Sequence, residues 1–156
     1  MSNLLTIRSL EALDVDRASA LHGEAFAALG ERAWTRQEIA ELLASPGVAG
    51  LLLQKEGEDI GLALVRTVAD EAELLTIGVC PDHRRLGAGR ALLLKVIDVA
   101  RTRGARSLFL EVGADNPVAL ALYEGAGFRL IGRRAAYYSR SVRSAADALV
   151  MRLALD

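Results

Sequence analysis

The spacing of hydrophobic and polar positions along the chain predicts a mixed α+β fold. Short apolar runs rich in β-branched residues and bounded by Gly, Pro or charged residues predict strands, and apolar residues repeating every three to four positions predict helices. The strands are expected at 4–10, 48–54, 60–68, 72–80, 107–112, 128–134 and 148–155. The helices are expected from Asp14 or Asp16 to about Ala28, from Thr35 to about Ser45, from a glycine-containing loop to Arg103, and from Asn116 to Gly125.

Local signals place these elements in the order βααβββαβαββ. Thr35 followed by Glu38 has the spacing of a capping box, and residues 56–59 carry the turn residues of a hairpin. Pro81 is expected to end the fourth strand because proline has no backbone N–H to donate to a neighbouring strand. Residues 139–146 are polar, basic and without periodicity, which predicts a mobile loop between the last two strands. We therefore expect a single domain over residues 1–156, with about seven strands and about four helices.

Composition narrows the class of protein. The chain is 52% hydrophobic and 25% charged, which is typical of a globular domain. Neither a membrane span nor a basic signal-peptide region is found in the sequence, and Cys80 is the single cysteine, so we expect a cytoplasmic protein. We read Cys80 as a small buried residue rather than a catalytic thiol.

The charge balance changes along the chain. The net charge of −1 argues against a nucleic-acid binder. Residues 1–78 hold 6 Lys and Arg against 13 Asp and Glu, whereas residues 79–156 hold 13 against 7. A basic half suits an anionic ligand and an acidic half suits a cationic amine, although both could be ordinary solvated faces.

The most informative motif is Arg84-Arg85-Leu86-Gly87-Ala88-Gly89, followed by Arg90, between a predicted strand and a predicted helix. Glycines let a ligand approach the backbone, the free N–H groups of a first helical turn bind anions, and arginine adds charge-assisted hydrogen bonds. The motif lacks the Lys of a Walker loop and the third glycine of the dinucleotide fingerprint, where Leu92 stands. It therefore predicts a pyrophosphate site, the alternative being a glycine turn before an ordinary helix.

Together with the order of elements, this motif resembles the pyrophosphate signature of the GNAT superfamily of acetyl-CoA-dependent N-acetyltransferases. Two further blocks resemble the RimI branch of that superfamily, which acetylates the N-terminal alanine of a ribosomal protein. They span residues 108–128 and 133–151, including Asn116-Pro117, Leu122-Tyr123-Glu124 and Tyr137-Tyr138. The resemblance implies a GNAT fold, with a central, mostly antiparallel mixed sheet flanked by helices, and acetyl-CoA as co-substrate with no metal.

The resemblance also implies a set of cofactor-binding residues. The backbone at Ile77, Gly78 and Val79 would pair with the pantetheine arm, and the Val79 N–H is the expected oxyanion donor. Asn116 is a helix cap in its own right and would also contact the cofactor. The pyrophosphate would be held by Arg84, Arg85, Leu86, Gly87, Ala88, Gly89 and Arg90.

Two residues are candidates for proton transfer. Alternation along 108–112 places Glu111 on the face opposite Leu108, Leu110 and Val112, and a carboxylate in so apolar a strand needs a partner or a purpose. Its candidate role is general base, the alternative being a salt bridge to a neighbouring arginine. Tyr123 follows Asn116 by two helical turns and is the candidate general acid, the alternative being an aromatic packed on the sheet.

The acceptor is expected to be a primary amine, most simply a protein N-terminus. Trp34, Tyr137 and Tyr138 are candidate substrate-binding residues that could clamp a peptide, although Trp34 could equally be a core residue. RimI-type chains usually carry Arg and Pro where this chain has Gly113 and Ser139, which leaves room for a small-molecule amine. A third hypothesis is a non-catalytic acetyl-CoA-binding module. No nucleic-acid or membrane partner is expected, and the protein is expected to be a monomer or a weak homodimer.

Overall fold

The computed structural model describes residues 4–29, 31–84, 87–140 and 143–155, and it gives the backbone alone for residues 28, 136–140 and 143–146. Seven strands form one sheet in the order β1-β2-β3-β4-β5-β7-β6. All neighbours are antiparallel except β4 and β5. The strands are β1 Leu5–Ser9, β2 Val48–Lys55, β3 Glu58–Val68, β4 Glu71–Val79, β5 Ser107–Gly113, β6 Arg129–Arg140 and β7 Arg143–Ala154. The predicted fold class and the order βααβββαβαββ are confirmed.

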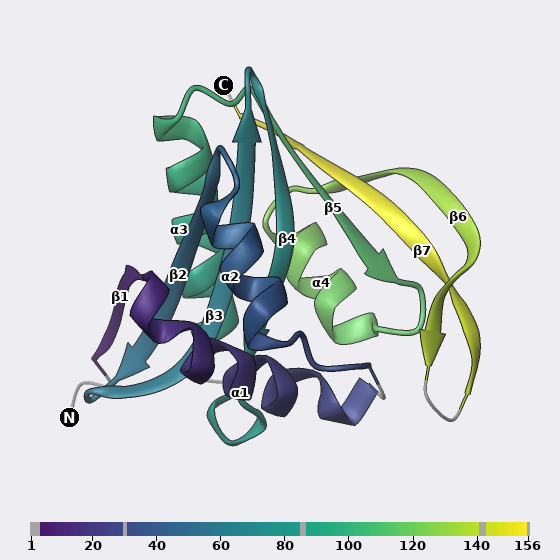
Figure 1. Ribbon diagram of the computed structural model, residues 1–156. Coiled ribbons are helices and arrows are strands. Elements are labelled where there is room, and N and C mark those ends of the chain that lie inside the picture. The colour runs from purple at the N-terminus through teal and green to yellow at the C-terminus, as the bar shows by residue number, and fades with distance from the viewer. Residues whose placement is uncertain (1–3, 30, 85–86, 141–142, 156) are drawn as a thin grey trace.

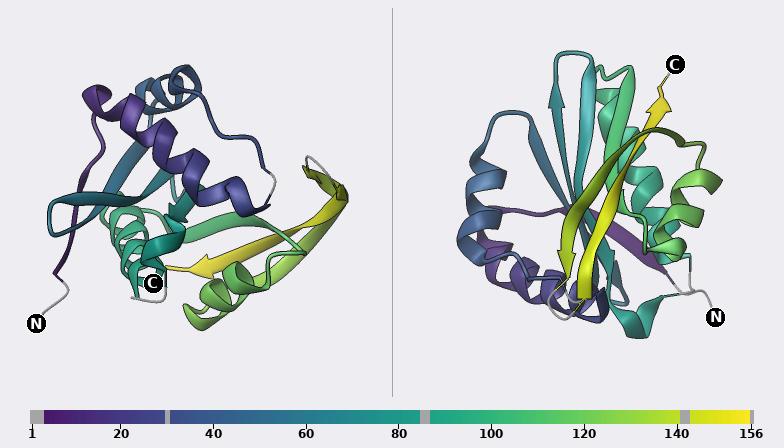
Figure 2. Two further views of the ribbon diagram at one scale, coloured as in Figure 1. Left: turned by 90° about the horizontal axis from the view of Figure 1, so that it is seen from below. Right: turned by 90° about the vertical axis from the view of Figure 1, so that its right-hand side faces the viewer.

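In the part of the chain that the structure describes, four α-helices cover the two faces of the sheet. They are α1 Val15–Phe26, α2 Arg36–Ala44, α3 Ala88–Thr102 and α4 Pro117–Gly125, with short 3₁₀ turns at Ala12–Asp14, Ala27–Leu29 and Pro81–His83. Figure 2 shows α1 and α2 on one side of the sheet and α3 and α4 on the other. Within the described residues no helix is long and apolar enough to cross a membrane.

The two faces bury separate hydrophobic clusters. Leu51 and Leu53 of β2 pack with α3, whereas Leu52 between them packs with α1 and α2. Because side chains alternate across a strand, burial on both faces requires an uninterrupted apolar run, as in residues 51–53. This explains why β2 reads in the sequence as a continuous hydrophobic segment.

One turn and one helix cap follow the sequence prediction. The β2–β3 hairpin turns at Glu56 and Gly57, which have positive φ angles of 51° and 82°. Thr35 caps α2: its hydroxyl accepts from the Glu38 N–H at 3.1 Å, and the Glu38 carboxylate accepts from the Thr35 N–H at 3.1 Å. The capping box fixes where the segment before α2 ends and the helix begins.

The predicted mobile loop at 139–146 is wrong. β6 continues to Arg140 and β7 begins at Arg143, with Tyr138 paired to Ala146 and Arg140 paired to Arg143; residues 141–142 lie outside the described residues. Hydrophobic alternation reveals a strand when one of its faces is buried, whereas ladder hydrogen bonds are made by the backbone and need no such pattern. The sequence therefore gives no hydrophobic pattern that predicts this part of the hairpin.

Helix α1 lies very close to β4. A Cβ atom added to Gly78 would lie 2.7 Å from the Ala25 Cβ and 3.1 Å from the Phe26 Cε2. Strand β3 also leaves no room for a side chain at Gly61, because a Cβ there would lie 2.8 Å from the Gly78 carbonyl oxygen. The missing side chain at Gly78 is what lets the C-terminal half of α1 lie on the sheet.

Gly78→Ala is expected to destabilise the protein by about 1–3 kcal/mol, because the added methyl group forces α1 away from β4. The matched control is Gly125→Ala in α4, where an added Cβ meets nothing within 4 Å and where alanine should be neutral or stabilising. Urea unfolding of both variants measures the difference. Equal midpoints would show that the close approach at Gly78 carries no stability.

Candidate functional site

The sheet opens between its two parallel strands. The ladder between β4 and β5, both described in full, comprises the pairs Glu71↔Ser107, Ala72↔Leu108 and Glu73↔Phe109 and ends there. Figure 1 shows the two strands meeting at one end and diverging toward the other. Because residues alternate in which neighbour their N–H and C=O groups face, part of the β4 backbone beyond Glu73 faces this gap rather than a strand.

A cavity of about 320 Å³ fills the gap. Residues from β4, β5, α4, α1 and the segment before α2 line it together. They are His22, Phe26, Leu29, Glu31, Arg32, Trp34, Leu74, Leu75, Thr76, Ile77, Leu110, Glu111, Val112, Gly113, Asn116, Ala119 and Tyr123. Of the predicted site residues, the structure thus brings together Ile77, Glu111, Asn116, Tyr123 and Trp34.

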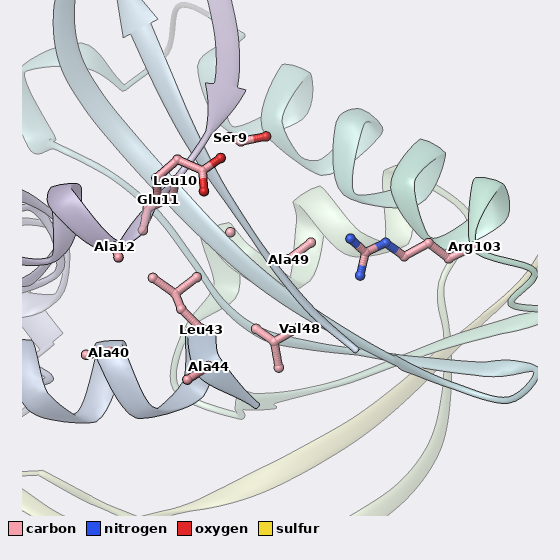
Figure 3. Close-up of a pocket in the computed structure, with 11 residues that line it drawn as sticks. Ser9, Leu10, Glu11, Ala12, Ala40, Leu43, Ala44, Val48, Ala49 and Arg103 are labelled. Atoms are coloured by element: carbon pink, nitrogen blue, oxygen red, sulfur yellow. The ribbon is translucent and has the colours of Figure 1, made fainter. Parts of the chain in front are cut away.

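A second hollow, of about 360 Å³, lies elsewhere and contains none of the predicted site residues. It is bordered by residues 9–12, the end of α2, the start of β2 and Arg103. Figure 3 shows mostly short or apolar side chains around it, with Glu11 and Arg103 on different sides. The cavity between β4 and β5 is therefore the candidate active site.

Glu111 lies on β5 as the alternation predicted. Its neighbours Leu110 and Val112 are buried, whereas the Glu111 side chain is 23% exposed and borders the cavity. The Glu111 carboxylate also forms an ion pair with Arg134 of β6, with 2.9 Å between Oε1 and Nη2. Because β7 lies between β5 and β6, the guanidinium reaches across a strand to make this contact. The ion pair with Arg134 does not exclude a role for Glu111 as general base, since one carboxylate oxygen can be paired while the side chain still borders the cavity.

Helix α4 brings Asn116 and Tyr123 to the same cavity. The Asn116 Oδ1 accepts from the Ala119 N–H at 3.2 Å, so the predicted helix cap is confirmed. This bond leaves the Asn116 amide N–H groups unused by the cap. The Tyr123 side chain is buried, with its ring edge-on to Phe128 at 5.8 Å between centroids. Core packing therefore fixes the direction of the Tyr123 ring while part of it borders the cavity.

The N-terminus of α3 differs from those of α2 and α4. Thr35 and Asn116 cap those helices, whereas within the described residues no side chain caps α3. Gly87, the residue before α3, has a φ angle of +73°, and an added Cβ would meet nothing within 4 Å. An uncapped first turn with open space before it presents backbone N–H groups and the positive end of the helix dipole. Arg85 and Leu86 lie outside the described residues.

Arg84 makes contacts that the motif did not reveal. Its Nη2 donates to the Ala25 carbonyl at 2.6 Å and its Nε donates to the Val79 carbonyl at 3.1 Å. The side chain thus ties the glycine loop to the end of β4 and to α1. Arg90 is exposed in the first turn of α3. Phosphate contact by either guanidinium stays a prediction.

Cys80 is buried, as predicted. Its thiol donates to the Glu24 Oε2 at 3.1 Å, and burial together with this carboxylate raises the pKa of Cys80 to about 12. A thiol with so high a pKa stays protonated at neutral pH and is a poor nucleophile. Within the described chain no group of three or more His, Cys, Asp or Glu side chains could hold a metal ion.

His22 is a cavity residue that sequence reasoning missed. It is 3% exposed, lines the cavity, and accepts a hydrogen bond at Nδ1 from the Trp34 N–H at 3.2 Å. The available signal was its position beside Leu21, on the face of α1 that also carries Ala18 and Ala25. Trp34 is half-buried, packs against the α1–α2 core cluster and borders the cavity. Its contact with an acceptor stays a prediction. The side chains of Tyr137 and Tyr138 lie outside the described residues.

Comparisons with known proteins agree with this geometry. Residues 15–128 match the Acetyltransferase (GNAT) family. The chain is 37% identical over 153 residues to the [ribosomal protein bS18]-alanine N-acetyltransferase of Escherichia coli, covering 97% of this chain and 98% of that protein. It is 37% identical over 152 residues to the N-alpha-acetyltransferase RimI of Mycobacterium tuberculosis, covering 95% and 91% of the two chains. The crystal structure of the ribosomal-protein-S18-alanine N-acetyltransferase from Escherichia coli superposes with a TM-score of 0.89 at 35% identity, covering 98% and 95% of the two chains.

Proposed function

Because the chain belongs to the GNAT acetyltransferase family, we propose that it transfers the acetyl group of acetyl-CoA to the N-terminal α-amine of a protein, with alanine as the first residue. The observation that carries the proposal is the cavity between β4 and β5. There a candidate base, Glu111, and a candidate acid, Tyr123, lie beside the free edge of β4. The relatives reported above act, by their names, on a ribosomal protein or on α-amines, and they match this chain over nearly its whole length.

The uncapped end of α3 fits the diphosphate of acetyl-CoA. Its first-turn N–H groups have no side-chain cap, its first turn holds no acidic residue, and Gly87 leaves open space in front of it. Gly89 lies beside α4, since its added Cβ would be 3.6 Å from the Leu122 Cδ2, next in sequence to Tyr123. A diphosphate bound at Gly87–Arg90 is thus held close to the helix that carries the candidate acid. The free edge of β4 near Ile77 would pair with the pantetheine amides.

The chain's own residues divide the remaining chemistry. Acetyl-CoA, when bound, supplies an acyl group activated as a thioester. The Glu111 carboxylate takes a proton from the acceptor ammonium, directly or through one water, so that the nitrogen can attack. The backbone N–H of Val79 is the proposed donor to the developing oxyanion. As the C–S bond breaks, the Tyr123 hydroxyl is proposed to give its proton to the departing sulfur and to regain one from the nitrogen that becomes the amide.

An α-amine suits this machinery better than a lysine. The pKa of an α-amine is about 8 and that of lysine about 10.4, so deprotonating lysine at pH 7 costs about 3 kcal/mol more.

The direct test offers the purified protein acetyl-CoA with peptides that differ in their first residue, beside free amino acids and polyamines. We expect mass spectrometry to find one acetyl group on the α-amine of the alanine peptide. Acetylation of the small amines in preference to every peptide would replace this function with small-molecule acetylation. Acetyl-CoA binding with no transfer to any amine would indicate a binding module.

Gly87→Val is expected to weaken acetyl-CoA binding by about tenfold or more, because the side chain occupies the space that a diphosphate needs. The matched control is Gly57→Val, which has a similar positive φ of 82° and open space but lies in the β2–β3 turn. Both variants carry similar backbone strain, so calorimetric titration separates strain from blocked access. Equal affinities in the two variants would exclude the α3 N-terminus as the diphosphate site.

Glu111→Gln is expected to lower kcat near neutral pH by about a hundredfold, the scale of general-base catalysis, while acetyl-CoA affinity is retained. Arg134→Gln removes the other half of the ion pair and is expected to retain most of kcat. Steady-state kinetics measure kcat in both variants, and calorimetric titration measures their affinity for acetyl-CoA. Equal losses of kcat in the two variants would assign Glu111 a structural role as an ion-pair partner.

A further inference from the structure

Both backbone polar groups of Trp34 are bound by side chains of α1. The Ser19 hydroxyl donates to the Trp34 carbonyl at 2.7 Å, and the Trp34 N–H donates to the His22 Nδ1 at 3.2 Å. Ser19 and His22 are three residues apart, so they lie on the same face of the helix. Gly23 beside them faces the same segment, since an added Cβ there would lie 3.4 Å from the Ala33 Cβ, an ordinary contact distance.

Ring stacking reinforces these bonds. The His22 imidazole is stacked on the Trp34 indole, with centroids 4.8 Å apart and ring planes at 20°, and its centroid lies 4.5 Å from that of Phe26. All three rings line the cavity between β4 and β5. The indole is therefore fixed both through its backbone and through its face.

His22 serves this arrangement in its neutral form. A nitrogen that accepts from an N–H carries no proton, so the proton of the neutral ring lies on Nε2. Burial lowers the pKa of His22 to about 4; Glu38 and Arg32, the charged groups that act on it, oppose each other and are bound together at 2.6 Å. An imidazole whose Nδ1 is occupied and which resists protonation is suited to holding a group in place rather than to moving protons.

We propose that Ser19 and His22 form a clamp that fixes Trp34 as a rigid wall of the cavity, and that the acceptor binds on this side, lined by α1 and the segment before α2. The clamp then sets the affinity and selectivity for the acceptor. The clamp rests on the proposed acetyl transfer. Ser19 and His22 are positioning residues, because they act through Trp34. A fixed indole limits the room for the first side chain of an acceptor peptide, which favours a small residue and disfavours a large one.

Kinetics of Ser19→Ala and His22→Phe test the clamp. Each variant is expected to raise the KM for an alanine peptide by roughly fivefold to tenfold, the effect of one lost hydrogen bond. The KM for acetyl-CoA, the saturated kcat and its pH profile should stay within about twofold, and acetylation of a peptide with a large first residue should improve relative to alanine. His22→Asn, which offers an oxygen near the position of Nδ1, should recover part of the acceptor affinity.

Two controls separate the clamp from general loss of structure. Ser45→Ala removes a comparable hydroxyl-to-carbonyl bond, to Glu41 at 2.8 Å, on the far end of α2, and should leave the acceptor KM unchanged. In a Trp34→Ala background, His22→Phe should add no further change in that KM. An additive effect there, an unchanged acceptor KM in both clamp variants, or a shifted pH profile would overturn the clamp.

Trp34 is the single tryptophan of the chain, so its fluorescence reports on the clamp without any turnover. Ser19→Ala and His22→Phe should shift the emission to longer wavelength and raise acrylamide quenching, whereas Ser45→Ala should change neither. Wild-type emission and quenching in both clamp variants would show that Trp34 is not held by α1. The expected fluorescence change in a protein that transfers acetyl to no amine would overturn the proposed function while leaving the fixing of Trp34 intact.

Discussion

The divergence of β4 from β5 after three residue pairs is the constraint on which the site depends. A sheet normally pairs its backbone groups with the next strand, and leaving them in an apolar interior without partners is costly. Here the gap is open to a cavity, so the exposed edge of β4 can be satisfied by water or by a ligand that carries amides of its own. The same divergence leaves the edge of β5 near Glu111 open to the cavity instead of paired with β4.

Helix α1 contacts β4, Arg84 and the segment before α2. Close packing at Gly78 brings the helix onto β4. Arg84 donates to the Ala25 carbonyl at the end of α1, which ties the glycine loop to this helix. Ser19 and His22, on the same helix, bind the backbone of Trp34. One rigid helix thus contacts both the loop proposed to hold the diphosphate and the wall proposed to meet the acceptor. A displacement of α1 would therefore disturb both ends of the cavity together.

Sequence reasoning succeeded where a local pattern reports directly on structure. Alternation placed Glu111 on its own face of β5, helical spacing put Asn116 and Tyr123 on one side of α4, and the Thr35–Glu38 capping box appeared as expected. The order of elements followed from hydrophobic periodicity, because burial on one face of a helix or on both faces of β2 and β3 leaves a readable pattern. These are relations between residues close in sequence, which need no knowledge of tertiary contacts.

The features that escaped prediction depend on contacts that no local pattern of residue types reveals. Phosphate contact by Arg84 stays a prediction, but its bonds from Nε to the Val79 carbonyl and from Nη2 to the Ala25 carbonyl were not predicted, and Ala25 lies 59 residues away. The sequence places His22 on the apolar face of α1, but its role depends on the residue that packs against it, here Trp34. The β6–β7 hairpin pairs through its backbone across residues without alternation. Since the Glu111–Arg134 ion pair also reaches across β7, that hairpin contributes to the electrostatics of the cavity. Residues 139–140 of the predicted loop therefore continue β6, the strand that carries Arg134, the partner of the candidate base.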